Sequence, residues 1–196
     1  MGLRQLYDKT EAEYRSVFFK LLDDYGRTLS EMLSAEGGHA IYAHCGLGEE
    51  QLKSRVEQEN IPAATTFINR AEMNYYLEQA LSYKVDEISK WFFQGYPANS
   101  KARLHYENLE LTIDIGELDV GFGYKKERTK GKTELAKYAT SAMTVVLKRS
   151  HDPNSQFGFY VNTVYPTITK KASIRQMEPQ ERFESKLERE IIENYL

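Results

Sequence analysis

The spacing of apolar residues changes once along this chain of 196 residues, near residue 100. Before that point apolar residues recur every three or four positions, as in amphipathic helices. Beyond it Leu109, Leu111 and Ile113 alternate with polar residues, which is typical of a strand with one buried face. Helices followed by a run of strands indicate an α+β fold rather than alternating βαβ units. We therefore expect N-terminal helices, then a twisted antiparallel sheet, and a C-terminal helix.

Four helices are predicted from the apolar spacing, over residues 10–36, 49–59, 69–94 and 178–196. The first begins with a capping box, because Thr10 is followed three residues later by Glu13. The second buries Leu52 and leaves Arg55 beside the buried face. The third has Lys84 within its apolar face, so this lysine is expected to reach solvent along its aliphatic stem.

Four strands are predicted next, over residues 109–115, 120–126, 143–148 and 157–167. Glycines in the second strand predict a bulge. The third strand is expected at the centre of the sheet, and the fourth pairs back on it as a hairpin partner. Pro166 cannot donate a backbone hydrogen bond and should end the fourth strand. The segment 125–137 is expected to be a long basic loop, suited to a polyanion or to a docking partner.

The overall charge of −3 hides an uneven distribution. Residues 1–120 contain 12 Lys/Arg against 20 Asp/Glu, whereas residues 121–175 contain 11 against 3. A cationic segment of this kind attracts polyanions. The candidate RNA-binding residues are Lys125, Lys126, Lys130, Lys132 and Lys148. Taken alone, the basic residues 125–132 are more typical of a solvated loop than of a polyanion-binding site. Their function therefore depends on which residues lie nearby.

Several classes of protein and of site are not supported by the sequence. The single cysteine, Cys45, allows no intramolecular disulfide, and a free thiol is compatible with a reducing cytoplasm. Cys45 follows His44, but neighbours in sequence rarely face each other, so we expect a small buried residue rather than a nucleophile. No apolar run approaches the roughly 20 residues of a membrane span, and no secretory signal is predicted. Phosphate-loop, dinucleotide and zinc motifs are also absent, so neither a metal nor a nucleotide cofactor is predicted.

Candidate catalytic groups occur at two places. The last predicted strand puts Thr163 and Tyr165 on one face, because alternate residues of a strand share a face. His39 and His44 lie in a glycine-rich segment just before a predicted helix, whereas His151 lies in a turn and is expected at the surface. Imidazole titrates near neutral pH, so a histidine beside a cationic segment is suited to proton transfer on a phosphodiester.

Short motifs then follow one another in order: Gly37-Gly38-His39, His44-x-Gly46, Leu52-x-x-Arg55, Asp114-Ile115-Gly116, Val145-Val146-Leu147-Lys148-Arg149 and Thr163-Val164-Tyr165-Pro166-Thr167. Their order and spacing resemble the bacterial RNase-A-like toxin domain at the C-terminus of contact-dependent growth inhibition proteins and related polymorphic toxins. The resemblance implies a pancreatic-ribonuclease-like fold without disulfides, whose site contains a histidine, an arginine and a threonine–tyrosine pair. By motif position these are His44, Arg55, Thr163 and Tyr165. It also implies an accessory helix (1–36), a catalytic domain (37–170) and a C-terminal helix (171–196).

The implied activity is metal-independent endonucleolytic cleavage of RNA by its own 2′-OH, with tRNA among the candidate targets. His44 would transfer protons and Arg55 would stabilise the charge that develops at phosphorus. Thr163 and Tyr165 would hydrogen-bond the substrate, and the tyrosine hydroxyl, with a usual pKa near 10, can donate a proton but is a poor base. His39 would be needed only in a two-histidine mechanism.

Two other functions fit the same residues. One is a non-catalytic module that binds RNA or protein through the basic sheet, and the other is a phosphodiesterase that acts on a small nucleotide. The expected partners of a toxin are RNA and a cognate immunity protein that covers the basic cleft, and its expected site of action is the cytoplasm of a target cell.

Overall fold

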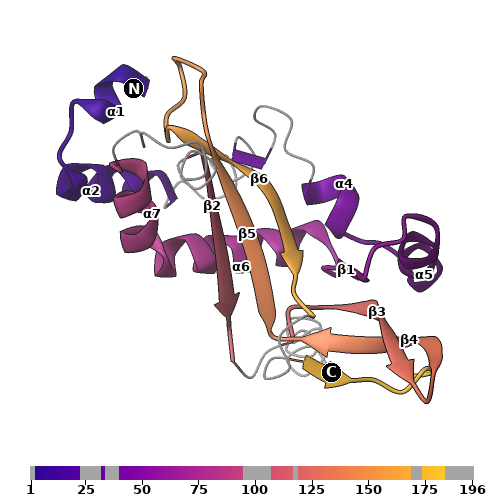
Figure 1. The fold of residues 1–196 in the computed structure, drawn as a ribbon. Helices are drawn as coiled ribbons and strands as arrows, with labels where there is room; N and C mark the ends of the chain where they lie inside the picture. Colours follow the sequence, from indigo (N-terminus) through magenta and orange to yellow (C-terminus); the bar gives the residue numbers. More distant parts are fainter. Residues whose placement is uncertain are drawn as a thin grey trace, which may run out of the picture. The chain divides into compact units, whose positions relative to one another are not determined.

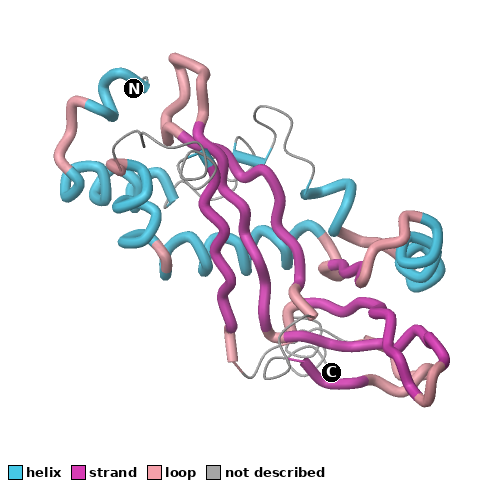
Figure 2. Tube along the Cα trace, in the orientation of Figure 1, coloured by secondary structure: helices cyan, strands magenta, loops and turns pink. Residues whose placement is uncertain are grey.

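The computed structural model has the predicted α+β architecture, with helices early and strands late in the chain (Figures 1 and 2). The structure describes residues 3–22, 32–33, 40–94, 107–116, 119–168 and 174–183. The chain forms two compact units, each built from three segments. The first unit contains residues 1–40, 74–111 and 145–164, and the second contains residues 41–73, 112–144 and 165–196.

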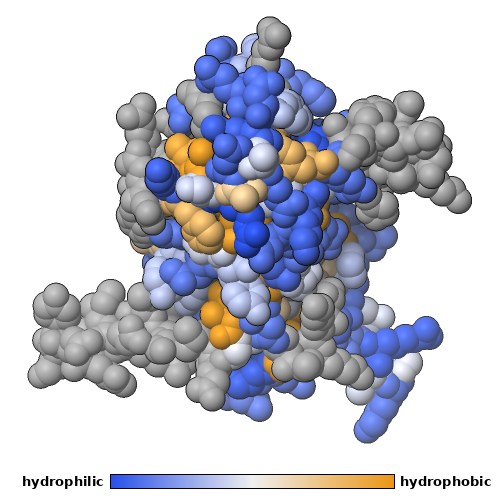
Figure 3. Space-filling view, turned by 90° about the vertical axis from the view of Figure 1, so that its left-hand side faces the viewer, coloured by the Kyte–Doolittle hydropathy of each residue, from blue (hydrophilic) through white to orange (hydrophobic). Residues whose placement is uncertain are grey.

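Aromatic side chains hold the helices of the first unit together. Tyr14 of α2 (Glu11–Leu22) stacks on Phe92 of α7 (Val85–Phe92), with ring centroids 4.5 Å apart. The Tyr14 hydroxyl donates a hydrogen bond of 2.9 Å to the carbonyl of Phe157. Figure 3 looks onto the side of α2, where apolar residues reach the surface in small patches among hydrophilic ones. The stacking of Tyr14 on Phe92 therefore helps to hold α2 against α7.

The predicted helix boundaries are partly confirmed. The capping box is present, because the N–H of Thr10 donates to Glu13 at 2.7 Å and the N–H of Glu13 donates to the Thr10 hydroxyl at 3.3 Å. A short helix, α1 (Leu3–Tyr7), precedes it. The third predicted helix is two helices, α6 (Arg70–Tyr83) and α7, with Lys84 between them. Lys84 therefore caps a helix instead of lying within one apolar face, and its Nζ bonds Glu87 at 2.9 Å.

A three-stranded sheet contains β2 (Asn108–Asp114), β5 (Ala142–Arg149) and β6 (Phe159–Pro166) in the order β2-β5-β6. The central place of β5 confirms the prediction from its apolar sequence. β6 is its hydrogen-bonded neighbour, as predicted for a hairpin partner, and it ends at Pro166. The last strand residues thus bring Thr163, Tyr165 and their neighbours to the end of this sheet.

The second unit contains a four-stranded antiparallel sheet in the order β1-β3-β4-β7. Its strands are β1 (Ala63–Thr66), β3 (Gly121–Thr129), β4 (Lys132–Thr140) and β7 (Ile174–Gln176). The pairing of β3 with β4 is continuous over all nine residues, so the predicted bulge is wrong. The glycines instead allow close packing: a Cβ added at Gly123 would stand only 2.9 Å from Thr65 Cα in β1.

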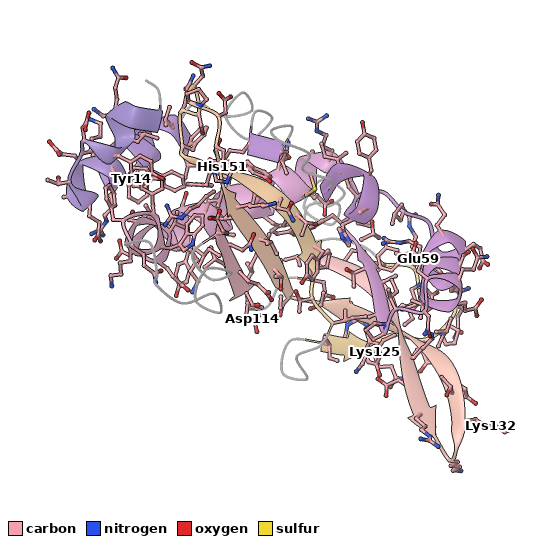
Figure 4. The ribbon with its side chains drawn as sticks, turned by 45° about the horizontal axis from the view of Figure 1, so that its top comes forward. Tyr14, Glu59, Asp114, Lys125, Lys132 and His151 are labelled. Atoms are coloured by element: carbon pink, nitrogen blue, oxygen red, sulfur yellow. The ribbon has the colours of Figure 1, made fainter. Side chains whose placement is uncertain are left out.

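The segment 125–137 is a hairpin and not the predicted loop. β3 and β4 are joined by Lys130 and Gly131, which both have positive φ (51° and 82°), as a two-residue type I′ turn requires. Figure 4 shows Lys132 at the far end of this hairpin, with Lys125 nearer the body of the sheet. Strands β1, β4 and β7 were not predicted, because their polar or very short sequences carry little apolar alternation.

Helix α5 (Glu49–Gln58) packs on this sheet as its apolar spacing predicts. Leu52 and Val56 are fully buried, and Arg55 lies beside them at the edge. The rest of the core cluster comes from the sheet and the segment after it: Ala64, Phe122, Tyr124, Ala139, Met177 and Phe183. Burial of this face fixes α5, and with it the direction of Arg55, relative to β1 and β3.

The predicted C-terminal helix is corrected at its start. Residues 178–183 contain a turn at Pro179 and Gln180 instead of a first helical turn, and residues 184–196 lie outside the described residues. Predictions for residues 23–31 and for His39 also fall outside them. Within the described ranges, no helix is both long enough and apolar enough to span a membrane.

Candidate active site

Main-chain contacts position His44 in the second unit. His44 ends the short helix α4 (Ala40–His44), and its carbonyl accepts a hydrogen bond of 2.9 Å from the N–H of Phe67. The N–H of Gly46 donates in turn to the Phe67 carbonyl, also at 2.9 Å. Nδ1 of the His44 ring lies 3.4 Å from the carbonyl oxygen of Thr65 in β1. Thr65 of β1 thus contacts the ring of His44, and Phe67, just after β1, holds its backbone.

The contact with Thr65 also favours one tautomer of His44. A carbonyl oxygen accepts hydrogen bonds but cannot donate them, so the proton of this contact belongs to Nδ1 of the imidazole. In the neutral ring the lone pair then lies on Nε2. The half-buried His44 side chain is thus oriented with its basic nitrogen on the side away from β1.

Tyr165 lies next to His44, in the same unit. The centroids of the two rings are 5.2 Å apart, with an angle of 38° between the ring planes. Beyond Tyr165, the N–H of Thr167 donates to the Ala142 carbonyl at 2.8 Å, and its hydroxyl lies 2.7 Å from that of Thr144. These buried contacts fix the end of β6 and so the place of the tyrosine ring.

Arg55 is joined to the helix that carries His44. Its Nη1 donates a hydrogen bond of 2.6 Å to the carbonyl of Ala43, one residue before His44. Nε and Nη2 face the carboxylate of Glu59, at 3.1 and 3.3 Å. Arg55 thus satisfies a carbonyl at the end of α4, which has no partner within the helix itself. The structure brings together His44, Tyr165 and Arg55, three of the four predicted site residues.

Thr163 lies on β6 within the first unit, two residues before Tyr165. Its side chain is buried, and its hydroxyl oxygen has no hydrogen-bond partner among the described residues. Buried hydroxyls usually have a partner, so a group without one is a candidate to bind a ligand. Thr163 and Tyr165 are alternate residues of one strand, as the sequence predicts.

The five predicted RNA-binding lysines have different surroundings. Lys130 and Lys132 are exposed at the tip of the β3–β4 hairpin. Lys125 is half-buried and pairs with a glutamate of its own strand at 3.0 Å, and Lys126 donates to an asparagine side chain at 3.1 Å. Lys148 lies on β5 in the first unit and is half-buried. The tip lysines are therefore the best placed for an anionic partner.

Sequence reasoning missed a polar network beneath α5. The Lys137 side chain is 2% exposed, and its Nζ donates to Glu49 at 2.6 Å and to the Glu181 carbonyl at 2.5 Å. The Tyr124 hydroxyl donates to the other oxygen of Glu49 at 2.6 Å. The inward position of Lys137 could have been found from its alternation with Leu135 and Ala139, had the segment been recognised as a strand.

The network sets the ionisation of Glu49. Burial, the largest single influence, raises the pKa of this carboxyl, but the hydrogen bonds from Lys137 and Tyr124 and the nearby lysine charges outweigh it, so the pKa is lowered. Burial and the adjacent carboxylate raise the pKa of Tyr124 well above its usual value. The network ties the first turn of α5 to β3 and β4, and thereby supports the helix of Arg55.

The thiol of Cys45 is poorly suited to act as a nucleophile. Cys45 is half-buried, and burial raises the pKa of its thiol, so it stays protonated at neutral pH. In the described part of the chain, no group of three or more His, Cys, Asp or Glu side chains is arranged to hold a metal ion.

The model of one protein family, the bacterial CdiA-CT RNAse A domain, matches residues 38–166, which is well over half of the chain. The chain belongs to this family. Membership confirms the resemblance seen in the sequence motifs, and it makes this CdiA-CT domain a ribonuclease toxin of contact-dependent growth inhibition. The roles of its individual site residues remain predictions.

A solved structure shares the fold of this CdiA-CT domain. One chain in the crystal structure of a CdiA-CT/CdiI complex from Y. kristensenii 33638 is 21% identical to it, with a TM-score of 0.51. The match covers 66% of this chain and 99% of that chain. At this identity the likeness establishes the fold alone. No curated protein matches the chain.

Proposed function

We propose that this domain is a metal-independent endoribonuclease that cleaves RNA by attack of a 2′-OH on the adjacent phosphorus. The observation that carries the proposal is the pairing of the His44 and Tyr165 rings, 5.2 Å apart, in the unit where Arg55 contacts the residue before His44. Such cleavage needs a base, an acid and positive charge near the phosphate, and these three side chains can supply them.

His44 acts as the base in this proposal. Its Nε2 accepts the proton of the 2′-OH, and the 2′-oxygen forms a bond to phosphorus while the bond from phosphorus to the 5′-oxygen breaks. The hydroxyl of Tyr165 gives its proton to the departing 5′-oxygen, because a tyrosine is protonated at neutral pH. The products are a 2′,3′-cyclic phosphate and a 5′-hydroxyl, and a proton passing from His44 to Tyr165 restores both groups.

Arg55 stabilises the additional negative charge of the phosphorane-like transition state, for which a planar and permanently charged guanidinium is suited. The buried hydroxyl of Thr163 hydrogen-bonds the substrate. The exposed Lys130 and Lys132 at the hairpin tip, with Lys125, Lys126 and Lys148, attract the RNA backbone. tRNA is a candidate target among the RNAs of the cell.

We further propose that a cognate immunity protein binds this domain and covers its basic surface. The proposal is supported by the related crystal structure, which is a complex of a CdiA-CT with a CdiI. The cytoplasm of a target cell, where RNA is abundant, is the proposed site of action.

The test is cleavage of tRNA and total RNA in EDTA by the wild type, His44→Ala and Tyr165→Phe. His151→Ala is a matched control, since His151 is a histidine of the first unit whose side chain is 77% exposed. We expect His44→Ala to lower the rate by about 10²–10⁴-fold, as loss of a general base does. Cleaved ends should carry 2′,3′-cyclic phosphates. Intact RNA in the presence of folded wild-type protein contradicts the proposal and favours a non-catalytic binding module.

A further inference from the structure

Glu59 faces two of the three nitrogens of the Arg55 guanidinium. It is the residue that caps α5 at its C-terminal end, four positions after Arg55 (Figure 4). Its Oε1 lies 3.1 Å from Nε and its Oε2 lies 3.3 Å from Nη2. Nη1 donates to the Ala43 carbonyl at 2.6 Å. All three nitrogens of Arg55 therefore have an acceptor, and the plane of the guanidinium is fixed.

This arrangement leaves donors for a substrate. A guanidinium has five N–H groups, and the contacts with Glu59 and Ala43 use one on each nitrogen. One N–H remains on each of Nη1 and Nη2, and these two groups can donate to phosphate oxygens. Glu59 and the Ala43 carbonyl thus determine the direction in which Arg55 presents them.

Glu59 also affects the strength of phosphate binding. Its carboxylate carries a negative charge beside the Arg55 guanidinium, and its side chain is 50% exposed. It repels a phosphodiester in the ground state and, because the transition state carries additional negative charge, repels the transition state more, so this repulsion weakens RNA binding and does not itself assist cleavage. The orientation of Arg55, in contrast, matters most where charge develops on the phosphate oxygens.

We propose that Glu59 is a positioning residue of the ribonuclease reaction, which holds Arg55 against the α4 carbonyl and weakens its hold on ground-state RNA. The proposal rests on the proposed function, in which Arg55 stabilises the transition state. It predicts a specific pattern when the carboxylate is neutralised: RNA binds more tightly and is cleaved more slowly. A purely structural role would lower kcat without tightening binding.

The experiment compares Glu59→Gln with Glu50→Gln. Glu50 lies on the same helix, pairs with Lys53 at 2.8 Å and does not contact Arg55, so both variants lose one negative charge from α5. Relative to Glu50→Gln, we expect kcat of Glu59→Gln to fall about tenfold, because a loosened guanidinium is less accurately placed. We expect its KM to fall about threefold, because interactions between exposed charges contribute little free energy. If either change is missing, the proposal is overturned.

A binding measurement separates this proposal from the proposed function. A 2′-O-methyl RNA oligonucleotide has no attacking hydroxyl, so its Kd can be measured whether or not the protein cleaves RNA. Glu59→Gln should bind it about threefold more tightly than Glu50→Gln. Equal Kd values overturn the role of Glu59, whereas an inactive wild type that still shows the difference in Kd contradicts only the ribonuclease mechanism.

Discussion

Gly121 begins β3 between the main chain of β1 and the ring of Pro166, and we predict that an alanine there disrupts the proposed active site. A Cβ atom at this position would stand 2.5 Å from the Thr66 carbonyl oxygen and 2.9 Å from Pro166 Cβ. Ordinary contact begins at 3.4 Å, so the Thr66 oxygen must move by 0.9 Å (3.4 minus 2.5). Pro166 must move by more than 0.5 Å (3.4 minus 2.9), because its Cγ atom would stand closer to the added Cβ than its own Cβ does. Neither can yield easily, because one contact is with backbone and the other with a rigid ring.

Both displaced segments hold residues of the site. Thr66 follows Thr65, whose carbonyl contacts His44, and Pro166 follows Tyr165. A methyl group between Thr66 and Pro166 should therefore change the 5.2 Å distance between the centroids of the His44 and Tyr165 rings. Overpacking of this kind costs about 1–3 kcal/mol of stability. A displacement near 1 Å at a catalytic group costs about 100-fold in rate. We therefore expect Gly121→Ala to fold with reduced stability and to lose about 100-fold of its activity.

Urea denaturation gives the free energy of unfolding of Gly121→Ala, and initial rates of RNA cleavage give its activity. Gly48→Ala is the control, because its added Cβ meets only the Gln51 side chain, at 3.6 Å, and its φ of −74° suits alanine. The reasoning is refuted if Gly121→Ala cleaves RNA within threefold of the control and unfolds with the same free energy.

Two further predictions concern stability. Because the folded pKa of Glu49 is lowered from 4.5, its contribution is complete above about pH 4.5 and is lost as the pH falls through the folded value. The difference in unfolding free energy between wild type and Glu49→Gln should therefore shrink between pH 7 and pH 3, and a constant difference would falsify this. Buried Arg149 donates to the carbonyls of Phe92 and Trp91 at 2.9 and 2.5 Å, so Arg149→Met should cost about 2–4 kcal/mol in urea denaturation. If Arg149→Met loses no more stability than the neighbouring Lys148→Met, the hydrogen bonds of Arg149 to these two carbonyls do not stabilise the fold as argued.

The sequence predicted those elements whose apolar residues repeat locally. Helix α5 was predicted almost to the residue, because Leu52 and Val56 mark its buried face and leave Arg55 at the edge. Strand β4 was missed because Lys137 takes an inward position that normally belongs to an apolar residue. Strand β1 has only four residues and is defined by its pairing with β3, which lies almost sixty positions away. Such non-local pairing leaves little local pattern in the chain.

The arrangement of the candidate site residues was predictable to a similar degree, while their roles stay predictions. Family motifs pointed to His44, Arg55 and Tyr165, and the structure brings these together in one unit. The ion pair of Arg55 with Glu59 could have been read from their spacing of four on a helix. The bond from Arg55 to the Ala43 carbonyl could not, because every residue has a carbonyl and its partner depends on the fold.

Main-chain atoms provide most of the contacts that place this site, and this has a consequence for how the domain tolerates change. The carbonyls of Ala43, Thr65 and Phe67 act on Arg55, His44 and Gly46 irrespective of their own side chains. Substitutions at Ala43, Thr65 and Phe67 should therefore be tolerated if the backbone keeps its path. The related crystal structure shares the fold at only 21% sequence identity, so most side chains of the fold can change. Positions where the backbone itself comes close, above all Gly121, should not tolerate any side chain, because there a single methyl group moves two supports of the site at once.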